Sequence, residues 1–197
     1  LETVLAQGIN VAGTPCMLLM QMPLPRSLQA EGAEDSFIRT LSQMQDDLRR
    51  DYVTGAYNAV YLNEQYRPIA ERAAMSGTPV GVVMVRVNEY WQLREHESDS
   101  AANCCLNMAA GILQLAVGPD HDKAVLARLN DGFFAIVTIG TPAARMAQTV
   151  REAMNDSRRE FNISLSRRGS FTVEIASAEW GETASWDMTL SLAQQRL

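Results

Sequence analysis

Hydrophobic side chains recur along residues 35–50 with the spacing of one helical face. Phe37, Leu41, Met44 and Leu48 are three or four positions apart, and the residues between them are mostly polar. An α-helix brings such positions onto one side because it has about 3.6 residues per turn. We therefore predict an amphipathic helix over 35–50.

The sequence after residue 58 alternates between helix-like and strand-like patterns. Continuous apolar runs and alternating apolar residues are typical of strands, whereas longer segments with one apolar face are typical of helices. The predicted helices cover about 59–75, 101–117, 143–154 and 186–197, and the predicted strands cover 80–87, 124–126, 135–139 and 171–178. Thr141 and Pro142 are expected to open the third of these helices, as its N-cap and its first residue. The polar stretch 94–100, which contains His96, is interpreted as a loop.

The order strand, helix, hairpin, helix, strand predicts an α/β (α+β) fold. Its centre is a mixed β-sheet with a βαββαβ core flanked by helices, as in ferredoxin-like proteins. We assign this domain to 51–197 and interpret 35–50 as a linker or signalling helix. Pro23, Pro25 and the polar stretch that follows them indicate a boundary, so 1–34 form an upstream segment, interpreted as the tail of a sensor domain. A chain that begins at Leu1 rather than Met is expected to belong to a longer protein.

Composition narrows the class of protein. Hydrophobic residues make up 47% of the chain, which excludes a wholly disordered protein, and a net charge of −6 argues against a general nucleic-acid binder. The sequence has neither a signal-peptide pattern nor an apolar run of about 18 residues. We expect a cytoplasmic segment without membrane contact of its own; a membrane anchor elsewhere in a longer protein stays open. Cys16, Cys104 and Cys105 lack the spacing of a disulfide framework or a zinc site.

Two turns carry the candidate chemistry. The first reads Asp-Tyr-Val-Thr-Gly-Ala-Tyr-Asn over 51–58, where Asp51 can cap the segment that it opens and Thr-Gly before Asn is a turn signal. The second reads Arg-Leu-Asn-Asp-Gly-Phe-Phe over 128–134, between two apolar runs. Asp and Gly tolerate the positive φ of a tight turn, so this segment predicts a β-hairpin.

Both turns resemble motifs of the GGDEF family of diguanylate cyclases. The family's opening motif, Asp-x-Leu-Thr-Gly-Leu-x-Asn-Arg, is matched at Asp51, Thr54, Gly55 and Asn58. In the family's hairpin, an Arg and one variable residue precede the signature Gly-Gly-Asp/Glu-Glu-Phe. The five residues at the signature positions here are Asn130, Asp131, Gly132, Phe133 and Phe134, of which the last one matches. Over about 51–197 the chain thus resembles a degenerate GGDEF domain, and the resemblance implies the palm-like fold of that family.

The residues that would bind metal in this family differ here. Active members join two GTP molecules into cyclic di-GMP, and the resemblance implies two carboxylates that hold divalent ions. Aligning 84–93 with the family's first core strand places Arg86 at the metal-binding Asp and Gly132 at the signature acid, while Asn88 and Trp91 replace a second Asp and a Lys. A fixed positive charge about 4 Å from a divalent ion costs about 8 kcal/mol at an effective dielectric constant of about 20. We expect Arg86 to mark a lost metal position.

The nucleotide-binding positions are also altered. The family's guanine-reading Asn and Asp align with Arg94 and Asn103, which are the candidates for nucleotide binding. The carboxylates nearest to the lost metal ligands are those of Glu89 and Asp131. Each is shifted by one residue from the position of a family ligand, and on a strand a shift of one residue turns the side chain to the opposite face. The family's product-inhibition motif, Arg-x-x-Asp, aligns with a segment that does not match it: His121, Asp122, Lys123 and Ala124.

The resemblance implies one function and leaves two alternatives. We interpret the chain as a catalytically inactive GGDEF-like regulatory or protein-interaction module in bacterial cyclic di-GMP-related signalling. Its expected partner is a protein or an adjacent domain of the same chain, with a homodimer through 35–50 as a further interpretation; no metal, cofactor or nucleic acid is expected. The alternatives are a non-catalytic domain that senses GTP without hydrolysing it, and an active diguanylate cyclase or related nucleotidyl cyclase. Whether an EAL-type phosphodiesterase domain follows residue 197 stays open.

Overall fold

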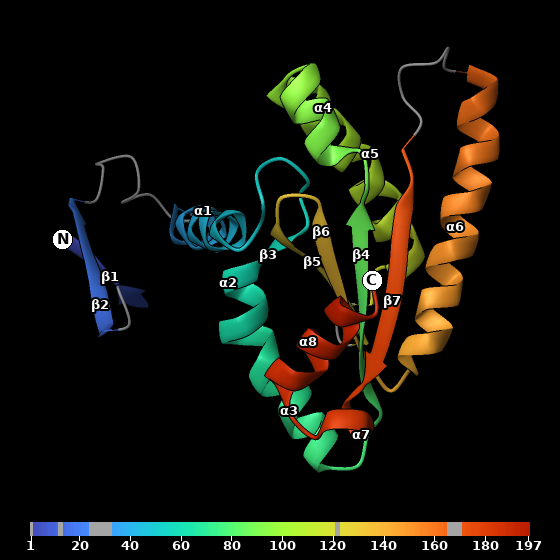
Figure 1. Cartoon of the computed structure of the whole chain (residues 1–197). Coiled ribbons are helices and arrows are strands. Elements are labelled where there is room, and N and C mark those ends of the chain that lie inside the picture. The colour runs from blue at the N-terminus through green and yellow to red at the C-terminus, as the bar shows by residue number, and fades with distance from the viewer. Residues whose placement is uncertain (1, 12–13, 24–32, 121–122, 165–170) are drawn as a thin grey trace. The chain divides into compact units, whose positions relative to one another are not determined.

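The computed structural model of the chain describes residues 2–11, 14–23, 33–120, 123–164 and 171–197 (Figure 1). These residues form two compact units, 1–46 and 47–197. The first unit contains an antiparallel hairpin of β1 (Glu2–Val11) and β2 (Thr14–Pro23). The apolar stretch 14–22, for which the sequence indicated no element, is therefore a strand.

Helix α1 (Ala33–Leu48) occupies the segment that the helical periodicity predicted, and it crosses the boundary between the two units. Ile38, Met44 and Leu48 are exposed, and Leu41 is partly buried. The side chain of Phe37 lies outside the described residues. The helix therefore presents large apolar side chains to solvent between Ile38 and Leu48.

A five-stranded mixed sheet forms the centre of the second unit, in the order β3-β5-β6-β4-β7 (Figure 1). The strands are β3 (Tyr57–Asn58), β4 (Val80–Val87), β5 (Ala124–Asn130), β6 (Phe133–Ile139) and β7 (Val173–Glu179). Strand β3 pairs parallel with β5, and the other neighbours are antiparallel. Without β3, this is the βαββαβ arrangement that the element order predicted, so the predicted fold class is confirmed.

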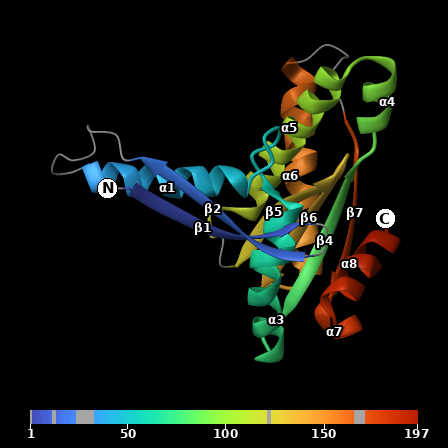
Figure 2. The same cartoon turned by 90° about the vertical axis from the view of Figure 1, so that its left-hand side faces the viewer.

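Helices cover both faces of the sheet, as Figures 1 and 2 show. Helices α5 (Asp99–Val117) and α6 (Ala143–Ser164) pack on the face that carries Val83 and Val85 of β4. The helical segment after β3 and helix α8 (Trp186–Gln195) pack on the other face, against Val82 and Met84. Because successive strand residues point to opposite faces, the continuous apolar run of β4 serves both cores. The helical segment after β3 consists of α2 (Ala59–Tyr61), a π-helical turn (Leu62–Tyr66) and α3 (Arg67–Met75).

Several local expectations were wrong. The stretch 94–100 is not a loop throughout, because α4 (Tyr90–His96) includes His96. The N-terminus of α6 is capped by Glu179, whose Oε1 accepts a hydrogen bond of 2.6 Å from the backbone N–H of Ala143, rather than by Thr141. A short helix, α7 (Trp180–Thr183), precedes α8. Helix α5 is long and apolar enough by composition to cross a membrane, but its apolar face is part of the core.

Candidate functional site

The predicted hairpin is confirmed, with Asp131 and Gly132 as the turn between β5 and β6. Asp131 has a φ of 29°, in the positive range that the sequence signal required. The carbonyl of Gly132 accepts a hydrogen bond of 2.9 Å from the N–H of Val87. The turn is therefore held against the end of β4, where the lost metal position was predicted.

Arg86 and Gly132 line the same cavity of about 340 Å³, which we call the Arg86 cavity. Its other walls include Asn88, Trp91 and Glu174. Arg86 lies opposite Glu174 in the pairing of β4 with β7, and its Nη2 forms an ion pair with that carboxylate. Its Nε donates a hydrogen bond of 3.3 Å to Asn88 Oδ1. A guanidinium and its counter-ion thus lie where the sequence predicted a lost metal position.

Glu89 is held by the segment before β7 and is not among the described residues that line the Arg86 cavity. Its Oε2 accepts a hydrogen bond of 2.7 Å from the N–H of Thr172, and its Oε1 accepts another of 2.7 Å from Thr172 Oγ1. The expectation that Glu89 and Asp131 lie on strands, one register off, was wrong. Glu89 follows the end of β4, and Asp131 lies in the hairpin turn.

Arg94 interacts with the acidic side chains around it. Its Nε donates a hydrogen bond of 3.0 Å to Asp99 Oδ1, and its Nη1 lies 3.7 Å from Asp131 Oδ1. Its guanidinium carbon lies 5.4 Å from the ring centroid of Trp91. Asn103 is half-buried on α5, and within the described residues neither Arg94 nor Asn103 lines the Arg86 cavity. The two nucleotide-binding candidates are therefore not brought together with Arg86.

The opening motif forms a capped turn, as its residues predicted. Asp51 Oδ1 accepts hydrogen bonds from the N–H of Thr54, at 2.9 Å, and from Thr54 Oγ1, at 2.7 Å. Gly55 has a φ of 68°, a conformation that glycine adopts without strain. We call residues 51–57 the opening turn.

A salt bridge that the sequence did not predict joins the opening turn to the hairpin. Arg128 Nη1 lies 3.0 Å and 3.1 Å from the two carboxylate oxygens of Asp51, and its Nη2 donates to the carbonyl of Asp131 at 3.3 Å. The side chains are only 13% and 16% exposed. Burial raises the pKa of the Asp51 carboxyl, but the hydrogen bonds from Thr54 and Arg128 outweigh it and hold that pKa below its ordinary value.

Asn58, the last residue of the opening motif, fastens the end of α1. Its Nδ2 donates a hydrogen bond of 2.9 Å to the carbonyl of Leu48, and its N–H donates to the carbonyl of Arg49 at 2.8 Å. Its Oδ1 caps α2 by accepting from the N–H of Tyr61 at 2.8 Å. One side chain thus connects the last turn of α1 with the first helix of the domain.

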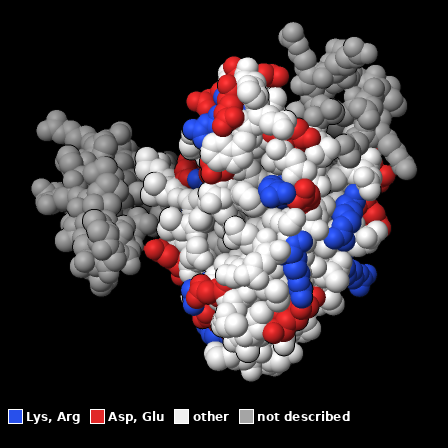
Figure 3. Space-filling view, in the orientation of Figure 1, with Lys and Arg blue, Asp and Glu red and all other residues white. Residues whose placement is uncertain are grey.

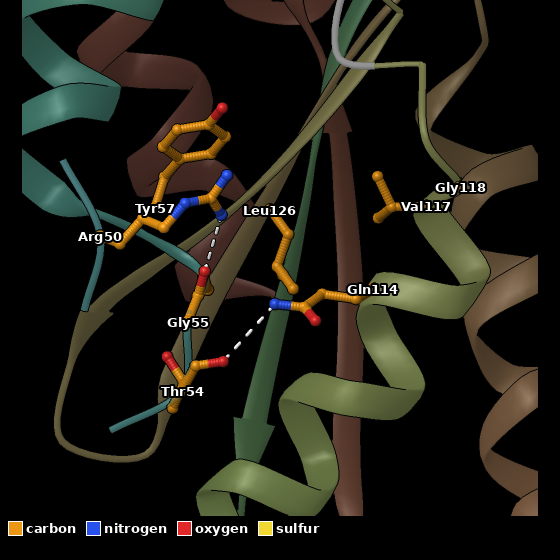
Figure 4. Close-up of a pocket in the computed structure, with 9 residues that line it drawn as sticks. Arg50, Thr54, Gly55, Tyr57, Gln114, Val117, Gly118 and Leu126 are labelled. Carbon is orange, nitrogen blue, oxygen red and sulfur yellow. Dashed lines mark hydrogen bonds between the residues drawn. The ribbon is translucent and has the colours of Figure 1, made fainter. Parts of the chain in front are cut away.

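A second cavity, also of about 340 Å³, lies between the opening turn and α5 (Figure 4), and we call it the Arg50 cavity. In Figure 4, Gln114 extends from α5 toward the opening turn, where its Nε2 donates a long hydrogen bond of 3.5 Å to the carbonyl of Thr54. Arg50 Nη1 donates to the carbonyl of Gly55 at 2.8 Å. Leu126 of β5 contributes to the apolar wall.

The chain and its fold match known proteins. The sequence profile of the family described as "Diguanylate cyclase, GGDEF domain" matches residues 48–197. Among solved structures, the coiled coil and GGDEF domain of DgcB from Caulobacter crescentus, in complex with c-di-GMP, has a TM-score of 0.71 and 18% identity over 86% of this chain and 89% of that one. The diguanylate cyclase SiaD from Pseudomonas aeruginosa, in complex with its activator SiaC, has a TM-score of 0.62 and 17% identity over 83% of this chain and 63% of that one.

A multidomain structure is also similar. The S helix-GGDEF-EAL portion of Vibrio cholerae LapD, bound to c-di-GMP, has a TM-score of 0.63 and 16% identity, over 81% of this chain and 36% of that one. At such low identities, the structural likeness establishes the fold alone. The family assignment comes from the sequence profile, whose match covers the whole five-stranded sheet and the helices that flank it. The chain therefore belongs to the GGDEF domain family.

Proposed function

We propose that this GGDEF domain is catalytically inactive and acts in cyclic di-GMP-related signalling through contacts with a protein partner or an adjacent domain. The observation that carries the proposal is the ion pair of Arg86 with Glu174 at the position where the family's metal-binding carboxylate aligns. A metal ion there would have to overcome repulsion by a guanidinium that is always protonated. The triphosphate would then lack the cation that neutralises it during phosphoryl transfer.

The second metal-binding carboxylate has little room at its aligned position. A Cβ atom added to Gly132 would lie 3.0 Å from both Tyr90 Cβ and the carbonyl oxygen of Val87. Contacts this short require the neighbouring atoms to shift, and the carbonyl belongs to backbone that is hydrogen-bonded to the turn. Replacing Arg86 by Asp would therefore restore one ligand without its partner.

GTP sensing without turnover is the alternative function. It would use Arg94 and Asn103, with GTP as a ligand that is not hydrolysed. The pairing of Arg94 with Asp99 and Asp131 argues against it, because a nucleotide would have to compete with two carboxylates for that guanidinium. A third alternative, an active cyclase, would need carboxylates at the positions of Arg86 and Gly132.

Helix α1 is proposed to transmit signals to the GGDEF domain and to form the contact between two copies of the chain in a homodimer. Leu41, Met44 and Leu48 continue the three- and four-residue spacing of a coiled coil, and Met44 and Leu48 are exposed. Support comes from the similar DgcB structure, which contains a coiled coil beside its GGDEF domain, and from SiaD, which is bound to an activator. The hydrogen bond of Asn58 to Leu48 would transmit a change in α1 to the opening turn.

The proposed setting is the bacterial cytoplasm, without binding to nucleic acid. On the face shown in Figure 3, Lys and Arg atoms lie beside Asp and Glu atoms, so the described residues on that face form no continuous basic surface. This distribution agrees with a net charge of −6.

A product assay tests the inactivity. The chain is incubated with GTP and magnesium and the nucleotides are separated by chromatography, with an active diguanylate cyclase as positive control. We expect no cyclic di-GMP from the wild type or from Arg86→Asp, because Gly132 still supplies no carboxylate. Cyclic di-GMP from the wild-type chain would overturn the proposal.

Sedimentation analysis tests the contact through α1. We expect Met44→Glu to lower the apparent mass of any self-associated species, because it places a charge in the apolar stripe. Gln43→Glu adds the same charge one position away and is expected to leave the mass unchanged. A monomeric wild-type chain, or equal effects of the two variants, would contradict a homodimer through this helix.

A further inference from the structure

We infer that Arg151 and Arg196 keep the β7 edge of the sheet closed, so that a second copy of the chain does not add a strand to it. This role goes beyond the proposed function and is independent of it, because it concerns the backbone of β7 rather than a nucleotide site or helix α1.

Strand β7 is the last strand in the order of the five-stranded sheet, and within the described residues it pairs with β4 alone (Figure 1). The N–H of Asn88, just after β4, donates a hydrogen bond of 3.0 Å to the carbonyl of Thr172, just before β7. In an antiparallel ladder, residue pairs that exchange hydrogen bonds alternate with pairs whose backbone groups point away from each other. The even-numbered residues of β7 therefore bond to β4, and the odd-numbered residues turn their N–H and C=O groups outward.

Two arginines reach this edge from opposite faces of the sheet and bind successive outward carbonyls. Arg151 of α6 donates through Nη2 to the carbonyl of Ile175 at 3.1 Å. Arg196, which directly follows α8, donates through Nη1 to the carbonyl of Ser177 at 2.7 Å. Because α6 and α8 pack on different faces, the edge is covered from both sides.

Glu182 of α7 holds Arg196 in this position. Its carboxylate forms an ion pair with Arg196 Nη2, and its Oε1 accepts from Arg196 Nη1 at 3.0 Å. The same oxygen accepts a hydrogen bond of 2.8 Å from the N–H of Glu179, the next outward residue of β7. The hydrogen bonds from Arg196 and Glu179 lower the pKa of the Glu182 carboxyl to about 2, so this carboxylate is ionised at neutral pH. Side chains thus bind three successive outward residues of β7.

Without the two arginines, the edge would present a row of backbone donors and acceptors. Within the part of the chain that the structure describes, the N–H groups of Ile175 and Ser177 have no acceptor. A strand edge with donors and acceptors that lack partners is a template for a strand of another chain. Each guanidinium occupies a carbonyl that an incoming strand would need, so the arginines oppose strand addition.

Strand β7 has little protection of its own. Its sequence, Val-Glu-Ile-Ala-Ser-Ala-Glu, contains neither Pro nor Lys, which commonly protect edge strands. Both of its carboxylates are engaged within the domain, Glu174 with Arg86 and Glu179 with the N-terminus of α6. Protection of this edge therefore depends on side chains from the neighbouring helices.

A peptide with the sequence of residues 172–180 tests the inference, because it is the strand that a second copy would add. Binding of the fluorescein-labelled peptide to the full chain is followed by fluorescence anisotropy. Arg151→Met/Arg196→Met removes both guanidinium groups and keeps most of their apolar stems. We expect this variant to bind the peptide at least about tenfold more tightly than the wild type does, since two carbonyls become available. Equal binding by the two proteins, or no binding by the folded variant, would overturn the inference.

Two controls separate edge pairing from a change of charge. Arg67→Met/Arg72→Met removes the same charge from α3, where Arg72 Nε also donates to a backbone carbonyl, that of Pro68, at 3.2 Å. We expect this variant to bind the peptide as weakly as the wild type does. A peptide with Pro in place of Ile175 and Ala176 lacks an N–H group on each of its edges and is expected to bind none of the proteins. Tight binding in either control would contradict strand addition.

Amide hydrogen exchange locates the contact, and the amide spectrum shows whether each variant is folded. We expect the bound peptide to slow exchange of the N–H groups of Ile175 and Ser177. Arg151→Met alone, which leaves the pair of Arg196 with Glu182 intact, is expected to give a smaller gain in affinity and tests the inference if the double variant unfolds. Slowed exchange elsewhere in the domain without protection of β7 would overturn the assignment.

Self-association is measured by sedimentation in the Met44→Glu background, in which contact through α1 is weakened. We expect Arg151→Met/Arg196→Met to increase the apparent mass with concentration relative to Met44→Glu alone. The two substitutions make a chain of net charge −6 more negative, which by itself opposes association. An unchanged mass would contradict a role of the arginines against a second copy.

Discussion

The salt bridge between Arg128 and Asp51 predicts a large effect of a single substitution on the stability of the domain. Arg128→Met retains most of the apolar stem but leaves the Asp51 carboxylate without its counter-ion. Removing one partner of a fully buried pair typically costs about 3–5 kcal/mol. Because the two side chains are 13% and 16% exposed and Thr54 still donates to Asp51, we expect a loss of about 2–3 kcal/mol. For a domain of this size, that corresponds to a decrease in Tm of about 4–12 °C.

Urea unfolding followed by tryptophan fluorescence measures this loss, since Trp91, Trp180 and Trp186 all lie in the second unit. Arg67→Met is the matched control, because Arg67 pairs with Glu71 and Asp187 at the surface and such pairs contribute about 0–1 kcal/mol. Equal losses in the two variants would refute the argument from burial.

The same pair predicts a dependence on pH. The pKa of the Asp51 carboxyl is lower in the folded protein than its ordinary value of 3.8. The ionised Asp51 carboxylate therefore stabilises the folded state fully above about pH 4, and this stabilisation is lost as the pH falls through the folded-state pKa of Asp51. We expect the difference in unfolding free energy between wild type and Arg128→Met to shrink below pH 4 in urea titrations. A difference that stays constant down to pH 2 would contradict this cause.

Two further predictions concern packing and cysteine reactivity. Gly81→Ala is expected to destabilise the domain by about 1–3 kcal/mol, because the new Cβ would lie 2.5 Å from Ala143 Cβ. Gly111→Ala in α5 places its Cβ in open space and is expected to stabilise the domain by about 0.4–1 kcal/mol. Urea titrations in which both substitutions changed the unfolding free energy in the same direction would contradict this prediction. Burial raises the pKa of the Cys105 thiol to about 12, whereas Cys104 is exposed. Iodoacetamide at neutral pH is therefore expected to alkylate Cys104 before Cys105, which peptide mass spectrometry would show. Faster labelling of Cys105 would disprove the packing of α5.

The features that sequence patterns predicted are those determined by neighbouring residues. The Asp131-Gly132 turn, the apolar run of β4 and the capping role of Asp51 each depend on side chains a few positions apart. Helix α4 was missed because a short helix with Tyr90 as its buried residue presents little apolar periodicity.

The contacts that the sequence did not predict join distant segments. Arg128 and Asp51 are 77 positions apart, and Glu179 caps α6 from a strand 36 positions away. The pairing of Arg86 with Glu174 depends on the register of β7 against β4, which hydrophobic periodicity does not specify. The sequence predicted a strand over 171–178, but it did not predict which side chain of that strand would face Arg86.

Calorimetry with GTP and magnesium tests the central claim most directly. GTP and cyclic di-GMP are each titrated into the chain with and without magnesium, and the GTP samples are then analysed for product. We predict no magnesium-dependent heat and no cyclic di-GMP, because in the proposed account Arg86, paired with Glu174, replaces one metal-binding carboxylate and Gly132 replaces the other. Magnesium-dependent GTP binding followed by formation of cyclic di-GMP would contradict the account.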